Sequence, residues 1–139
     1  MLGIALGIGL LVASIVLEAL FPGGERDIGP RLAKTDIDHF LLLLGYVIAS
    51  IGEEIQFRGY FLQQLAVYTR STGAAVALQA VFFVFAHGSG QGLSGYLTRF
   101  AIGIAFGLAA VHRKSLWPSM TAHLLINITV FIVGLTWAP

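Results

Sequence analysis

Hydrophobic residues fill five long segments of this chain, and polar residues gather in the short stretches between them. The apolar segments are residues 2–21, about 38–68, about 73–87, about 95–111 and about 117–136. An α-helix needs about 20 apolar residues to cross the roughly 30 Å hydrocarbon core of a bilayer. Because lipid offers the backbone no hydrogen-bond partners, each segment is expected to be helical. The pattern predicts an all-α protein, a polytopic transmembrane bundle of about five membrane helices.

The second segment is longer than one upright span requires. About 31 residues of helix would extend roughly 46 Å, so this helix must tilt, bend or continue out of the membrane. Gly52 and Gly59 lie within it as candidate points of bending or close packing. Glycines four residues apart permit close helix contacts, and they occur in the first and fourth segments: Gly3 and Gly7, Gly103 and Gly107.

We divide the chain into two parts. Residues 1–37 are expected to hold an N-terminal membrane helix and a loop, because proline and glycine punctuate residues 22–30. The first helix lacks the basic leading segment of a secretory signal, so we expect it to be retained. Residues 38–139 are expected to form the core helix bundle.

Composition supports an integral membrane protein. Hydrophobic residues make up 57% of the 139 residues and charged residues 11%, whereas soluble domains average about 25% charged residues. The formal net charge of +1 gives no basic field for nucleic acid. Cysteine is absent, which excludes disulfides, thiolate metal sites and cysteine nucleophiles.

Three fragments place ionisable or polar side chains inside apolar helical sequence. They are Glu53-Glu54-Ile-Gln-Phe-Arg58, Phe83-Val-Phe-Ala-His87 and His123-Leu-Leu-Ile-Asn127. A charged side chain in the hydrocarbon core costs at least a few kcal/mol, so such residues usually serve a function. The fragments therefore predict an active site that is buried in the bundle and drawn from three helices.

Helical spacing separates the two carboxylates of the first fragment. Glu54 and Arg58 are four residues apart and share a helix face, so an intrahelical ion pair is expected. Glu53 points about 100° away and has no partner within its own helix. This favours Glu53 as a general base and the other two as its support. The alternative is that all three residues only join helices through salt bridges.

The other two fragments have the same four-residue spacing. The ring of Phe83 can shield His87 from lipid or form a wall of the site, and His123 and Asn127 form a pair of donors or ligands on one face. Taken alone, His87 is also typical of an interfacial residue and Asn127 of an interhelical contact. Straight helices would place His87 far in depth from Glu53, so convergence needs tilted helices or a loop that dips inward.

Together and in this order, the three motifs resemble those of the CPBP family. This family comprises CAAX proteases and bacteriocin-processing proteins and is also called the type II CAAX prenyl endopeptidase or Abi family. The resemblance covers about residues 38–136. It implies a glutamate-dependent intramembrane endopeptidase, in which Glu53 and His87 activate a water molecule. His123 and Asn127 would then stabilise the oxyanion.

The resemblance also implies supporting residues and raises the question of a metal. The supporting residues are Glu54, Arg58 and Phe83. The family has also been described as metalloproteases, which makes Glu53, His87 and His123 candidate ligands of a Zn²⁺ ion. The four-residue spacing within each motif does not place ligands from different helices around one ion, so both mechanisms stay open and we slightly favour the metal-independent one.

The implied partners are membrane lipid and a peptide or lipidated protein substrate. The substrate would be a CAAX-type prenylated protein or a bacteriocin-like peptide, and the location would be the plasma membrane of a prokaryote. Two alternatives use the same residues differently. One is a non-catalytic membrane immunity or scaffold protein with the same fold, and the other is a small transporter with the charges as a relay.

Overall fold

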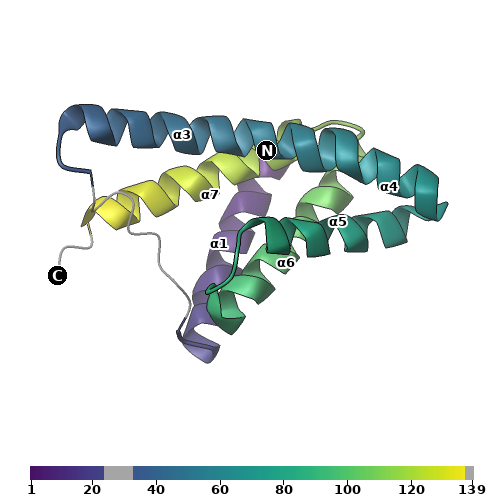
Figure 1. The fold of residues 1–139 in the computed structure, drawn as a ribbon, viewed down its shortest axis with the longest axis horizontal. Coiled ribbons are helices and arrows are strands. Elements are labelled where there is room, and N and C mark those ends of the chain that lie inside the picture. Colours follow the sequence, from purple (N-terminus) through teal and green to yellow (C-terminus); the bar gives the residue numbers. More distant parts are fainter. Residues whose placement is uncertain (24–32, 137–139) are drawn as a thin grey trace.

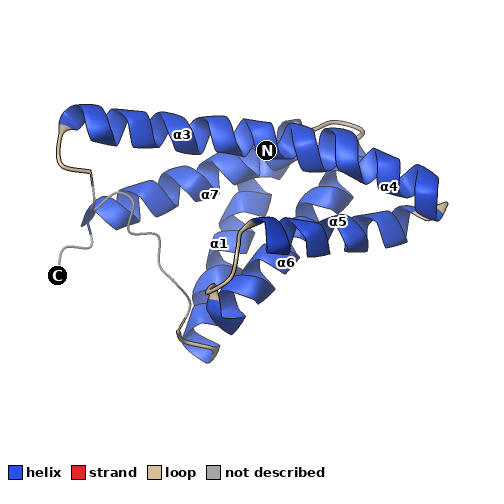
Figure 2. Cartoon of the chain, viewed as in Figure 1, coloured by secondary structure: helices blue, strands red, loops and turns tan. Residues whose placement is uncertain are grey.

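The computed structural model describes residues 1–23 and 33–136, and every regular element in these ranges is a helix (Figures 1 and 2). The helices are α1 (Leu2–Leu20), α3 (Asp36–Glu54), η1 (Ile55–Phe61), α4 (Leu62–Thr69), α5 (Thr72–Ala86), α6 (Gly92–Arg113) and α7 (Trp117–Thr136). Four helical spans are long and apolar enough to cross a membrane, and α5 is shorter. The predicted all-α membrane bundle is confirmed. Most of the predicted loop at 22–30 lies outside the described residues.

The longest span, Asp36–Thr69, is one continuous helix made of α3, η1 and α4. It begins with a capping box, in which the Thr35 hydroxyl accepts the Asp38 N–H and the Asp38 carboxylate accepts the Thr35 N–H. Seven residues in its middle, η1, are π-helical and directly follow Glu54. Single π-helical turns are rare and frequently occur at functional sites, so this wider turn marks the charged fragment.

The bundle is organised around antiparallel neighbours (Figure 1). α7 lies alongside α3, and α5 lies alongside α4, while α1 packs against both α6 and α7. A hydrogen bond joins α1 to the start of α6, where the hydroxyl of the buried Ser94 donates to the Glu18 carboxylate. One oxygen of this carboxylate therefore has a hydrogen-bond partner inside the protein.

Glycines create the closest helix contacts. A Cβ atom added at Gly103 would lie 2.8 Å from the Cα atom of Ala80 on α5. The four glycines of the two predicted pairs all lie at such contacts: Gly3, Gly7, Gly103 and Gly107. That prediction is confirmed. Near the charged fragment, Gly59 packs against Leu116, whereas Gly52 has open space around it.

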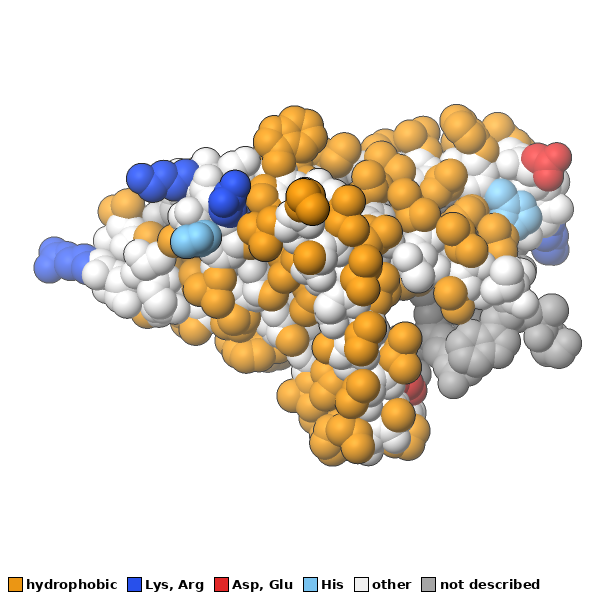
Figure 3. All heavy atoms as spheres, turned by 180° about the vertical axis from the view of Figure 1, so that it is seen from behind, with side chains coloured by type: hydrophobic (Ala, Val, Ile, Leu, Met, Phe, Trp, Pro, Cys, Tyr) orange, Lys and Arg blue, Asp and Glu red, His pale blue; other side chains and the backbone are white. Residues whose placement is uncertain are grey.

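The outer surface of the bundle is apolar. Hydrophobic side chains cover most of the face in Figure 3, and most of the charged side chains lie toward its two ends. Large apolar side chains on three helices are strongly exposed, among them Ile15 (69%), Ile48 (61%) and Phe85 (72%). Such contiguous apolar area is unusual on a soluble protein. It is the surface expected where lipid is the surrounding solvent.

The short length of α5 sets the depth of His87. α5 has 15 residues, and it runs antiparallel to η1 and α4, which contribute 7 and 8 residues. α5 therefore ends beside the junction of α3 and η1 instead of crossing the whole bundle. His87, the C-cap of α5, thereby reaches the level of Glu53. A helix of 15 residues, shorter than the roughly 20 of a full span, removes the mismatch in depth that straight, full-length helices imply.

We predict that Gly103→Ala lowers the melting temperature of the protein in detergent. Forcing an extra methyl group into a packed contact typically costs about 1–3 kcal/mol, and here the two nearest atoms are Cβ and Cα of Ala80 on α5, at 2.7 and 2.8 Å, neither of which can rotate away. Gly9→Ala is the matched control, because no atom lies within 4 Å of its added Cβ. Equal melting temperatures for the two variants would contradict the packing described here.

Candidate active site

The three polar fragments meet where α3, α5 and α7 come together. The Oε2 atom of Glu53 lies 3.7 Å from Nε2 of His87 and 3.9 Å from Nε2 of His123. This oxygen is buried and has no hydrogen-bond partner among the described residues, although the Glu53 side chain as a whole is 30% exposed. A buried carboxylate oxygen thus faces two imidazole nitrogens, while the rest of the Glu53 side chain is partly exposed.

The orientation of His87 follows from its other ring nitrogen. Nδ1 lies 2.7 Å from the carbonyl oxygen of Phe83. A carbonyl can only accept a hydrogen bond, so Nδ1 carries the proton. In the neutral ring, the lone pair of Nε2 is then left to face Glu53. The Phe83 ring packs against the imidazole, with 4.6 Å between ring centroids, and limits its rotation.

Glu54 orients His123 in a similar way. The Oε1 atom of Glu54 accepts hydrogen bonds from Nδ1 of His123 at 3.0 Å and from Nη1 of Arg58 at 2.8 Å. Glu54 is completely buried and Arg58 is 1% exposed, so the ion pair expected from the sequence is present and fully desolvated. Because Nδ1 donates to Glu54, Nε2 of His123 is the nitrogen that faces Glu53.

Aromatic rings enclose the guanidinium group of Arg58. Its central carbon lies 4.3 Å from the ring centroid of Phe83, 5.2 Å from that of Phe106 and 5.9 Å from that of Phe57. Nε and Nη2 of this group have no hydrogen-bond acceptor among the described residues. Cation–π attraction therefore replaces part of the lost hydration. Phe83 contacts both the arginine and His87, which makes it the wall between the ion pair and the histidine.

The amide of Asn127 is bound to α3, one turn before Glu54. Its Nδ2 atom donates to the hydroxyl of Ser50 at 3.0 Å and to the carbonyl oxygen of Tyr46 at 3.4 Å, both on α3. Six of the seven residues predicted from the sequence lie together: Glu53, Glu54, Arg58, Phe83, His87 and His123. Asn127 lies one helical turn beyond them.

Gln91 also supports this site, although the sequence offered no motif for it. Its side chain is 3% exposed, and Nε2 donates to the carbonyl oxygens of Val84 and Gly88. Carbonyls at a helix C-terminus lack intrahelical partners. The Gln91 amide is such a partner, and its two hydrogen bonds hold the segment that carries His87 in place. The only signal in the sequence is an amide in a glycine-rich stretch four residues after that histidine.

The arrangement does not fit a metal centre. One carboxylate and two imidazoles form a ligand set that zinc accepts. Within residues 1–23 and 33–136, however, no group of three or more His, Asp or Glu side chains has the geometry to hold a metal ion. The metalloprotease interpretation, with Glu53, His87 and His123 as ligands, therefore has no structural support. We derive no step through a metal.

A carboxylate with one buried oxygen that faces two imidazoles, inside a bundle of membrane helices, is the arrangement expected of an intramembrane hydrolase. The family model of the type II CAAX prenyl endopeptidase Rce1-like proteins matches residues 36–129. The chain belongs to this family, and the resemblance drawn from the three motifs is confirmed. The matched range begins with α3 and contains all three polar fragments. A search of curated proteins and a search of solved structures each found no match.

We predict that Arg58→Met destabilises the protein strongly. The change leaves the Glu54 carboxylate buried without its ion-pair partner, and breaking such a pair typically costs about 3–5 kcal/mol. Adding Glu54→Gln removes the orphaned charge and should restore part of the melting temperature measured in detergent. Arg113→Met, at an exposed helix end, is the control and should change little. A double variant less stable than Arg58→Met would contradict the pairing.

Proposed function

We propose that this protein is an intramembrane endopeptidase that hydrolyses a peptide bond by means of a water molecule activated by Glu53 and His87. The observation that supports this most is the unpaired, buried Oε2 atom of Glu53, which faces Nε2 of His87 and of His123. The separations of 3.7 and 3.9 Å exceed direct hydrogen bonds and suit a water molecule that contacts the carboxylate and an imidazole together. The family assigns the chain to proteases.

In the first step, the water bridges Glu53 and His87. Nε2 of His87 accepts one of its hydrogen bonds, since Nδ1 is already protonated and bound to Phe83. The Glu53 carboxylate takes the other proton as the water oxygen attacks the peptide carbonyl. A new carbon–oxygen bond forms, and the carbonyl oxygen becomes an oxyanion.

In the second step, the tetrahedral intermediate collapses. The carbon–nitrogen bond breaks, and Glu53, now protonated, returns its proton to the leaving amine. His123 can donate to the oxyanion through Nε2 only as an imidazolium, since Nδ1 already donates to Glu54. A preorganised donor of this kind typically contributes about 10²–10³ in rate.

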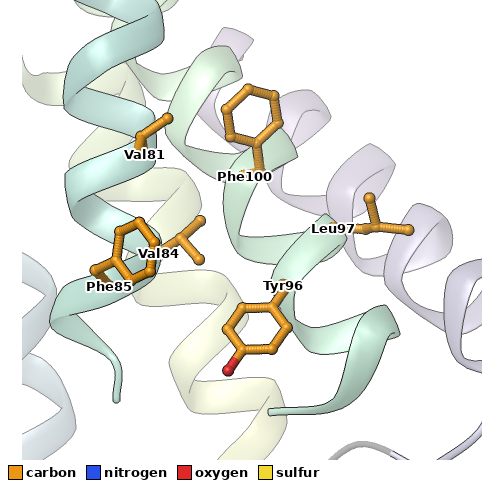
Figure 4. A pocket seen from close by; sticks show the side chains of 6 residues that line it. All are labelled: Val81, Val84, Phe85, Tyr96, Leu97 and Phe100. Atoms are coloured by element: carbon orange, nitrogen blue, oxygen red, sulfur yellow. The ribbon is translucent and has the colours of Figure 1, made fainter. Parts of the chain in front are cut away.

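An apolar groove supports a substrate that carries a hydrocarbon chain. It has a volume of about 260 Å³ and lies between the diverging ends of α5 and α6 (Figure 4). Its lining is entirely hydrophobic or aromatic: Val81, Val84, Phe85, Tyr96, Leu97 and Phe100. Val84 lies one helical turn before His87. A prenylated peptide of the CAAX type is the substrate that we favour over an unmodified bacteriocin-like peptide, and a prokaryotic plasma membrane stays the predicted location.

We predict that Glu53→Gln lowers cleavage of a prenylated peptide by ~10²–10⁴-fold, because an amide cannot take the proton from water. Asp36→Asn, an exposed change at the start of α3, is the carboxylate control and should retain activity. Cleavage by purified protein in detergent would be followed by mass spectrometry, with and without a zinc chelator. Unimpaired cleavage by the Glu53→Gln variant would refute the role of Glu53 as the base. Loss of cleavage on adding the chelator, with recovery on adding zinc, would refute the metal-free mechanism.

We also predict that Leu97→Trp, which fills the apolar groove, lowers kcat/KM for a prenylated peptide by at least ~10-fold relative to the same peptide without the lipid. Leu108→Trp is the matched control, because Leu108 lies on the same helix, is 54% exposed and does not line the groove. An equal effect of Leu97→Trp on both peptides would mean that the groove does not receive the substrate lipid.

A further inference from the structure

α3 and α7 are joined by three successive contacts at four-residue spacing. The first is an edge-to-face contact between Tyr46 and Phe131, with 6.0 Å between centroids. The second is the hydrogen bond from Asn127 to Ser50, and the third is the hydrogen bond from His123 to Glu54. Because the helices are antiparallel (Figure 1), each turn of α3 meets one turn of α7. We call these three contacts the α3–α7 ladder.

The middle contact depends on a completely buried hydroxyl group. Ser50 is 0% exposed, and its Oγ atom donates to the carbonyl oxygen of Tyr46 at 2.8 Å while it accepts from Asn127. The hydroxyl therefore acts both as a hydrogen-bond donor, to α3, and as a hydrogen-bond acceptor, from α7. A methyl group in its place could do neither, so the Asn127 amide would lose its shorter hydrogen bond in a site largely closed to water.

The amide nitrogen of Asn127 contacts two neighbouring acceptors on α3, which also bond to each other. An asparagine amide has two donors, and Nδ2 of Asn127 lies within hydrogen-bonding distance of Ser50 Oγ and Tyr46 O. Neither acceptor belongs to the group of residues around Glu53. An amide held in this way fixes one helix against the other.

We infer that Ser50 is a positioning residue for the proposed peptidase reaction, through its contact with Asn127. This inference rests on the proposed function. The Ser50–Asn127 contact fixes the register of α3 against α7, one turn away from the point where Glu54 binds Nδ1 of His123. Any slip between the helices would change the distance from Nε2 of His123 to Glu53. Misplacement by about 1 Å can cost as much as ~10² in rate.

The activity-independent test is nuclear magnetic resonance of protein labelled with ¹⁵N in its histidine rings, with His123 assigned by His123→Gln. Ser50→Ala should shift the ring nitrogen signals of His123, because the hydrogen bond to Glu54 depends on the register. Thr129→Val is the matched control, since the Thr129 hydroxyl donates within its own helix, to the carbonyl oxygen of Leu125. Unchanged His123 signals in Ser50→Ala would overturn the inference, even if no substrate is cleaved.

The kinetic test separates positioning from direct catalysis. Ser50→Ala should lower kcat by about 10-fold or more with little change in KM, because Ser50 does not touch the substrate. Asn127→Leu should cause a similar loss, and the double variant should be no worse than either. If Asn127→Leu loses ~10²–10³ in kcat while Ser50→Ala is unaffected, Asn127 is a direct oxyanion donor and the inference is wrong. Inactive, folded wild-type protein would instead refute the proposed function.

Discussion

The buried ion pair of Glu54 and Arg58 is the interaction on which the rest of the site depends. Two opposite charges at 2.8 Å, both shielded from solvent, survive in an apolar bundle only because each has further partners. Three aromatic rings face the guanidinium group, and His123 shares the carboxylate oxygen. The pair therefore does more than join two turns of one helix. It fixes which nitrogen of His123 is turned toward Glu53.

The second constraint is the depth at which α5 ends. A full-length helix would carry His87 to the far side of the membrane, whereas 15 residues return it to the start of η1. The side chain of Gln91 then donates hydrogen bonds to two carbonyl oxygens at that end of α5, and these bonds hold the segment that carries His87. Glu53, adjacent in sequence to the ion pair, is left with one buried oxygen that has no hydrogen-bond partner in the described part of the chain. Two adjacent residues of one helix thus differ in their roles: the Glu54 carboxylate is held in an ion pair, and the Glu53 carboxylate has an oxygen free to act as a base.

Sequence reasoning reached most of this arrangement through helical periodicity. Hydropathy located the spans, and four-residue spacing paired Glu54 with Arg58 and predicted the close contacts at Gly103 and Gly107. It could not give the π-helical η1, because a change from four- to five-residue hydrogen bonding leaves no mark on composition. The four-residue spacing put Asn127 and His123 on one face of α7. Their partners on α3 depend on how the two helices are aligned along each other, and the periodicity of one helix does not predict that alignment.

The most direct test of the central claim is a single turnover of a prenylated peptide in H₂¹⁸O, followed by mass spectrometry of both the peptide products and the protein. Attack by a water molecule that Glu53 activates places one ¹⁸O atom in the new C-terminal carboxylate and none in the protein. Label found in Glu53, with unlabelled product, would mean that the carboxylate attacks the peptide itself and is a nucleophile. An intact peptide after incubation with folded protein would contradict hydrolysis altogether.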